Sequence, residues 1–129
     1  MTIGIFVFGS NLAGHHGAGA ALAAYNDHQA RRGIGEGPTG QAYAIPTKDR
    51  ELRPLPRVVI HRHVRKFIEY ARQHPALHFV VTRVGCGLAG YTDADIAPFF
   101  VDAPDNCQLP DGWRTLARAM PEGGELFDV

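Results

Sequence analysis

Apolar residues recur with the period of an α-helix along residues 57–73. The spacing i, i+4, i+7, i+8 and i+11 places them on one stripe of a helix, while charged side chains occupy the other faces. The stripe consists of Ile60, Val64, Phe67, Ile68 and Ala71. Pro75 follows and cannot continue a helix, because proline lacks the backbone N–H. The pattern predicts an amphipathic helix over residues 57–73 that packs on a core.

Two runs of nearly continuous apolar residues predict buried strands. Residues 3–8 and 77–84 are rich in β-branched and aromatic side chains, as is typical of strands covered on both faces. The first run is expected to end at Gly9. Shorter runs predict two further strands, over residues 41–45 and 106–109.

Both long runs lead into glycine-rich loops. The second loop comprises residues 85–91, and the first carries Ser10, Asn11, Gly14, Gly17 and Gly19. An alanine-rich segment follows the first loop and predicts a helix over residues 17–32. Arg31 and Arg32 are expected in its last turn, where they would complement the helix dipole.

Glycine, proline and polar clusters predict the remaining connections. Residues 33–40 hold four glycines and one proline, which predicts a mobile loop, and residues 46–49 predict a polar turn. Thr92 is an expected N-cap with Asp95 three residues later, so a short helix is predicted over residues 93–100. Residues 113–120 predict a last helix, and the tail after Pro121 is expected to be loose.

The alternation of strands and helices predicts a single α/β domain over residues 1–129 with a largely parallel sheet. Ligands of such sheets bind beyond the carboxyl ends of the strands, where both glycine-rich loops begin. Glycines let the backbone approach a ligand closely, and a helix N-terminus presents free N–H groups. The two loops therefore predict a phosphate or diphosphate cradle. The spacing fits neither the dinucleotide fingerprint nor the P-loop, so a tight turn built for packing is the alternative.

Charge and cysteine content narrow the class of protein. The 129 residues contain 13 Lys and Arg and 13 Asp and Glu, so no overall basic field attracts nucleic acid. Several arginines in the middle third of the chain could form a local basic patch, so nucleic acid is not excluded as a partner. No run is long enough to cross a membrane, and Cys86 and Cys107 form no disulfide framework, which predicts a cytoplasmic protein with reduced thiols. Adjacent histidines such as His15 and His16 rarely chelate one ion, so no metal or cofactor is expected, and a solvent-facing or phosphate-contacting loop is favoured.

The order and spacing of these motifs resemble the macro domains, with the terminal ADP-ribose protein glycohydrolase branch as the nearest. The matching segments are GSNLAGHHGAGAALAAY, QAYAIPTKD and VGCGLAGYTDADIAPFF, which together extend over roughly residues 6–100. The resemblance implies a macro-like three-layer α/β/α domain with a mixed, largely parallel sheet. It also implies binding of ADP-ribose or a related nucleotide, free or on an ADP-ribosylated macromolecule, in a bacterial or phage-borne protein.

The resemblance also implies the residues of the site. Asn11 would contact the distal ribose, and Lys48 matches the nucleophilic lysine of the glycohydrolase branch. The remaining expected ligand contacts are Gly9, Ser10, Gly17, Ala18, Gly19, Thr47, Gly85, Cys86, Gly87, Leu88, Ala89, Gly90 and Tyr91.

Three departures from the family pattern bear on function. Ala89 occupies the position of the catalytic aspartate of the branch, so the lysine mechanism loses its acid/base partner unless Asp93 or Asp95 replaces it. The chain begins almost at the Asn-bearing strand, without the aspartate that holds adenine in the family. The usual Asn-Ala-Ala-Asn is shortened to Gly9-Ser10-Asn11, which indicates a smaller or different nucleotide.

Three functions are therefore compared. The preferred one is a module that binds ADP-ribose or a related nucleotide, because the cradle is kept and the catalytic aspartate is not. The first alternative is an ADP-ribosyl hydrolase that uses Lys48, Asn11 and Asp93. The second is an interaction protein that retains the fold without the ligand.

Overall fold

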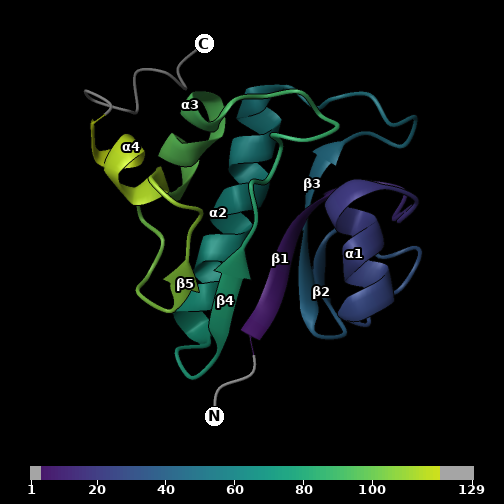
Figure 1. Ribbon diagram of the computed structural model, residues 1–129, viewed down its shortest axis with the longest axis horizontal. Coiled ribbons are helices and arrows are strands. Elements are labelled where there is room, and N and C mark those ends of the chain that lie inside the picture. The colour runs from purple at the N-terminus through teal and green to yellow at the C-terminus, as the bar shows by residue number, and fades with distance from the viewer. Residues whose placement is uncertain (1–3, 120–129) are drawn as a thin grey trace.

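The computed structural model describes residues 4–119, and their strands form one five-stranded sheet in the order β2-β3-β1-β4-β5 (Figure 1). The strands are β1 (Gly4–Asn11), β2 (Gly37–Thr39), β3 (Ala42–Lys48), β4 (His78–Val81) and β5 (Cys107–Gln108). The helices are α1 (Gly19–Asp27), α2 (Arg57–Gln73), α3 (Asp93–Ile96) and α4 (Trp113–Ala119), with a 3₁₀ turn η1 (Ala97–Phe100) after α3.

The sheet is mixed, with a parallel centre. β1 pairs in parallel with β3 on one side and with β4 on the other, and β4 pairs in parallel with β5. Only β2 is antiparallel, to β3. The expected α/β class with a mixed, largely parallel sheet is confirmed. Because β3, β1 and β4 run in the same direction, their carboxyl ends meet at one edge of the sheet.

Helices pack on both faces of this sheet. Phe8 and Ala44 belong to an apolar cluster with Ala21 and Ala24 of α1. Val7, the neighbour of Phe8, belongs instead to the cluster that includes α2. This opposite assignment follows from the period of two in a strand, which points successive side chains to opposite faces. The small side chains of α1 let it lie close to the sheet.

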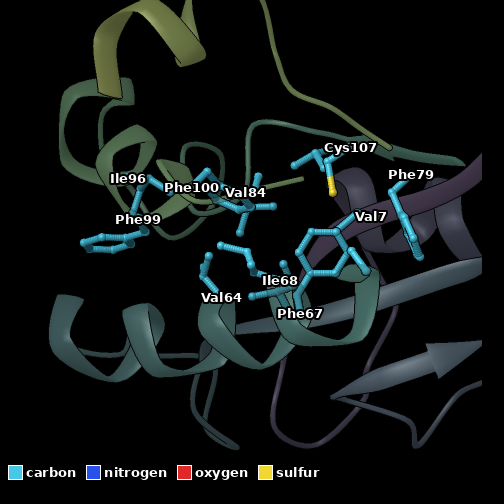
Figure 2. Packing of buried hydrophobic residues seen from close by; sticks show 14 of the residues in the cluster. Val7, Val64, Phe67, Ile68, Phe79, Val84, Ile96, Phe99, Phe100 and Cys107 are labelled. Carbon is cyan, nitrogen blue, oxygen red and sulfur yellow. The ribbon is translucent and has the colours of Figure 1, made fainter. Parts of the chain in front are cut away.

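The larger core is centred on Phe67 of α2 (Figure 2). Its ring lies 5.0 Å from that of Tyr43 and 5.4 Å from that of Phe79, both in edge-to-face geometry. All five residues of the predicted stripe are buried, and α2 begins and ends at the predicted residues. The helical period therefore predicted both the helix and the face that packs on the sheet.

Helix α1 is shorter than predicted. It ends at Asp27 instead of residue 32, because Gln29 has a left-handed backbone (φ 64°) that a helix cannot include. The prediction that Arg31 and Arg32 lie in its last turn is therefore wrong. The Arg32 guanidinium instead lies over the ring of Tyr25, 4.5 Å from its centroid.

Strands β1 and β3 extend further than predicted. β1 continues through Gly9 to Asn11, since Gly9 and Ser10 still pair with β3. The predicted polar turn at residues 46–49 is wrong in its first part, because β3 continues to Lys48. Proline is tolerated at position 46 because the pairing of β2 with β3 ends at Ala44, so no neighbour on that side needs its N–H.

The loop predicted over residues 33–40 contains β2 and is bound to the rest of the fold. The Ser10 hydroxyl donates to the Gly35 carbonyl, and Glu36 Oε2 lies 2.6 Å from His63 Nδ1 of α2. The second apolar run forms a shorter strand than predicted. β4 ends at Val81, although Thr82 still donates both its N–H and its hydroxyl to the Val7 carbonyl.

The other predicted elements lie close to their expected positions. Thr92 and Asp95 form a reciprocal capping box, and the helix they start continues as η1. β5 falls within predicted residues 106–109. Predicted residue 3, residue 120 and the tail lie outside the described residues. No helix formed by residues 4–119 has the length and apolar character needed to span a membrane.

Candidate functional site

A pocket of about 530 Å³ opens at the carboxyl ends of β3, β1 and β4. Its volume is in the range of pockets that hold drug-sized ligands. Most of the residues expected at the site lie on its wall. These are Gly9, Ser10, Asn11, Gly17, Ala18, Gly19, Thr47, Lys48, Gly85, Cys86, Gly87, Leu88 and Ala89. The parallel strands bring together segments that are far apart in the sequence.

The first turn of α1 presents backbone N–H groups to this pocket. Ala18 is the N-cap, with extended backbone and no side chain that accepts a hydrogen bond. No acceptor within the described residues pairs with the N–H groups of Gly19, Ala20 and Ala21. The first turn also contains no acidic residue. A helix N-terminus with free donors and partial positive charge suits an anion.

A second group of N–H donors lies on the loop after β4. The turn is closed by bonds from Gly90 N to Gly87 O, at 3.0 Å, and from Tyr91 N to Gly85 O, at 2.9 Å. Between them, the N–H groups of Gly87, Leu88 and Ala89 have no acceptor in the described part of the chain. Two separate groups of donors therefore line one pocket, which matches a ligand with two phosphoryl groups.

Polar side chains at the ends of β1 and β3 form hydrogen bonds to the backbone beside the pocket. Asn11 is only 4% exposed, and its amide accepts from His15 N at 2.9 Å and donates to His15 O at 2.8 Å. The Thr47 hydroxyl donates to Ser10 O at 3.2 Å. Asn11 thus holds the backbone of the first glycine-rich loop at His15. Its second amide N–H is not used by these bonds.

The pocket wall carries basic side chains and no acidic ones. Lys48, Arg83 and His15 line it, and none of the described lining residues is Asp or Glu. No carboxylate within residues 4–119 pairs with Lys48. The wall therefore favours an anionic ligand, while the carboxylate of a general acid or base is missing from it.

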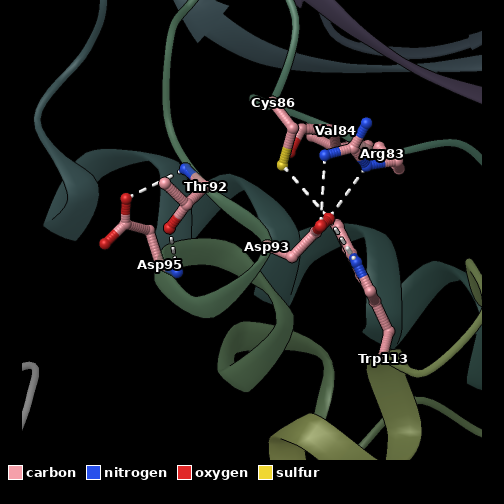
Figure 3. Close-up of polar contacts among 7 residues, drawn as sticks. All are labelled: Arg83, Val84, Cys86, Thr92, Asp93, Asp95 and Trp113. Atoms are coloured by element: carbon pink, nitrogen blue, oxygen red, sulfur yellow. Dashed lines mark hydrogen bonds and ion pairs between the residues drawn. The ribbon is translucent and has the colours of Figure 1, made fainter.

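Asp93 is held in a polar cluster beside the pocket (Figure 3). It accepts from Arg83 Nε at 2.9 Å and from Trp113 Nε1 at 2.8 Å. The hydrogen bond from Arg83 is the main reason why the pKa of Asp93 is below its usual value. The Cys86 thiol donates to the same carboxylate, with sulfur and oxygen 3.8 Å apart. Burial and the nearby carboxylate raise the pKa of Cys86 to about 11, so the thiol stays protonated at neutral pH and is a poor nucleophile.

Four residues considered for the site do not line the pocket. The Tyr91 hydroxyl donates to Leu55 O at 2.6 Å, so Tyr91 ties the second loop to the segment before α2. Gly90 adopts a left-handed backbone (φ 86°) at the end of that loop. Asp93 is engaged by Arg83 and Trp113, and Asp95 is engaged in the cap of α3. Neither aspartate therefore places a carboxylate on the pocket wall beside Ala89.

Several residues of the wall are not among the site residues that the sequence predicts. Thr82 and Arg83 immediately precede the second glycine-rich loop, and this position is the signal that could have identified them. Leu52 had no such signal, because it lies four residues beyond Lys48 in an irregular turn.

His16, expected at the surface or on phosphate, is 3% exposed and bonds through Nε2 to Arg31 O at 2.8 Å.

The described residues contain no group of three or more His, Cys, Asp or Glu side chains that could hold a metal ion. What this wall offers chemically is hydrogen-bond donors and positive charge. Comparison of the chain with protein-family models, with curated proteins and with solved structures found no match. The function of the protein is therefore inferred from the geometry of the pocket.

Proposed function

We propose that this protein is a binding module for ADP-ribose or a related nucleotide diphosphate with a ribose. The observation that carries the proposal is the pair of donor groups on one wall, at the start of α1 and at residues 87–89. Lys48 adds positive charge, whereas the guanidinium of Arg83 is already paired with the carboxylate of Asp93. A diphosphate supplies two anionic groups to these donors, whereas a monophosphate supplies one.

The partners of such a module are the free nucleotide or an ADP-ribosylated macromolecule. The macro-domain resemblance of the two loops supports this choice of ligand. We also infer a cytoplasmic location, because both cysteines are free, as is usual in a reducing compartment.

Calorimetric titration with ADP-ribose tests the proposal. The expected dissociation constant is micromolar, about −8 kcal/mol, and AMP and ribose 5-phosphate are expected to bind about tenfold more weakly or worse. Their single phosphate leaves one donor group unmatched. Absence of heat with all three compounds would contradict the proposal and favour an interaction protein that keeps the fold without a ligand.

A second candidate function is ADP-ribosyl hydrolysis, because Lys48 lies on the wall without a carboxylate partner in the described residues. In such a reaction the lysine amine forms a bond to the anomeric carbon of the ribose while the bond from that carbon to the modified side chain breaks. The side chain leaves with the proton of the amine, and water then cleaves the C–N bond and releases ADP-ribose. The missing carboxylate argues against efficient turnover, since general acid–base catalysis typically contributes about 100-fold or more.

Release of free ADP-ribose from an ADP-ribosylated protein separates the two functions. We expect binding without release. If the protein is instead a hydrolase, Lys48→Ala abolishes release, whereas Lys66→Ala does not. Lys66 is a suitable control because it lies on α2, outside the pocket wall, near Glu36 at 3.8 Å.

A further inference from the structure

Two leucines line the pocket without belonging to either apolar core. Leu52 is 49% exposed and Leu88 is 65% exposed, and neither packs against the two buried clusters. They are the only strongly exposed large apolar residues on this wall among those described. The rest of the wall is made mainly of glycine, alanine and polar side chains. When a ligand covers apolar surface that is exposed in a pocket, the removal of that surface from water favours binding.

Leu52 is held at the pocket by an unusual backbone conformation. Its φ of 68° lies in the left-handed region, which a bulky side chain rarely adopts. The turn around it is fixed by Asp49, whose Oδ1 accepts from Glu51 N and from Arg53 N, each at 2.9 Å. Leu52 N also donates to Asp49 O at 3.1 Å. The turn therefore imposes a conformation that leucine by itself disfavours, and it leaves the side chain half exposed.

Leu88 reaches the pocket from the other side of β1. It belongs to the loop after β4, whereas Leu52 follows β3, and these two strands flank β1. Leu88 lies against the start of α1, because a Cβ added to Gly19 would be 3.7 Å from Leu88 Cδ1. The two apolar side chains thus lie on one wall, at loops that follow the two strands flanking β1, and Leu88 adjoins the N–H donors at the start of α1.

We propose that Leu52 and Leu88 form a subsite for the base of the nucleotide, the flat aromatic ring whose phosphates meet the N–H donors. This inference rests on the proposed function and specifies its ligand as a nucleoside diphosphate. An aromatic ring has two apolar faces and a polar rim, so leucine side chains can cover its faces while its rim stays in water. A sugar phosphate without a base would leave both leucines exposed.

The test compares ADP-ribose with inorganic pyrophosphate by calorimetry, for the wild type, Leu52→Asn and Leu88→Ala. The affinity ratio of ADP-ribose to pyrophosphate is expected to fall about tenfold in each variant, because each loses apolar contact with the base. Leu22→Ala is the matched control, since Leu22 is an exposed leucine of α1 that is not on the pocket wall. Its ratio is expected to stay within twofold of the wild type.

Leu52→Asn also separates a binding role from a packing role. Asparagine tolerates the left-handed backbone, so the variant is expected to melt at the wild-type temperature or above it. A lower melting temperature would show that Leu52 supports the fold and would overturn its part in the subsite. If the wild type binds ADP-ribose and both variants keep its affinity ratio, the subsite is wrong and the proposed function stands. If the wild type binds neither compound, the proposed function fails as well.

Discussion

Replacing Gly35 with alanine is expected to lower the free energy of unfolding by about 3 kcal/mol, an overpacking effect at the upper end of its usual range. A Cβ at this position would lie 2.3 Å from Asn11 O and 2.9 Å from Leu12 O. Both atoms belong to the backbone at the end of β1, so no side chain can rotate away to make room. The methyl group must separate the segment before β2 from β1, which also breaks the bond from the Ser10 hydroxyl to Gly35 O.

Equilibrium unfolding in urea measures this effect, and Gly87→Ala is the matched control. A Cβ on Gly87 would have no atom within 4 Å, and its backbone is not left-handed. The control is therefore expected to change the free energy of unfolding by no more than about 0.5 kcal/mol. Equal stabilities for the two variants would show that the contact between residue 35 and β1 is absent in solution.

Replacing Gly17 with valine is expected to weaken ADP-ribose binding at least about 100-fold without destabilising the fold. Gly17 lies on the pocket wall, and no atom would lie within 4 Å of its added Cβ. The larger side chain therefore occupies space that only the ligand needs. It would hold the phosphate away from the N–H donors at the start of α1, and the loss of two such hydrogen bonds is enough for an effect of this size.

Titration calorimetry measures the loss of binding, and thermal unfolding checks the fold. Ala76→Val is the control, because Ala76 is an exposed residue that precedes β4, at the end of the sheet opposite the pocket. It is expected to bind ADP-ribose like the wild type. Wild-type affinity in Gly17→Val would mean that the ligand does not approach the start of α1, and the proposed phosphate position would then be wrong.

Most of the site residues that the sequence predicts line the pocket, but some do not. Most of the two glycine-rich loops, with Lys48 and Thr47, line one pocket, because parallel strands carry consecutive loops to the same edge of the sheet. From its position in the chain, Asp93 is predicted to lie near the ligand. Its position gave no sign of Arg83 and Trp113, which hold its carboxylate beside the pocket.

The sequence by itself determined the elements whose signal is local. The stripe on α2 is set by a period of 3.6 residues, and the cap of α3 needs only Thr92 and a residue three positions later. The continuous apolar runs likewise identify the strands β1 and β4, but β4 is fully buried on one face only, since His78 and Val80 are partly exposed.

Only the tertiary structure decided where β1 and β3 end, that residues 37–39 form a strand, and that Leu52 lies on the pocket wall. Each of these features depends on partners distant in sequence. Gly9 and Ser10 stay in β1 because β3 offers a ladder, and β2 forms because β3 has a free edge. Backbone pairing satisfies N–H and C=O groups whatever the side chains are, so residue type alone does not show where such pairing stops.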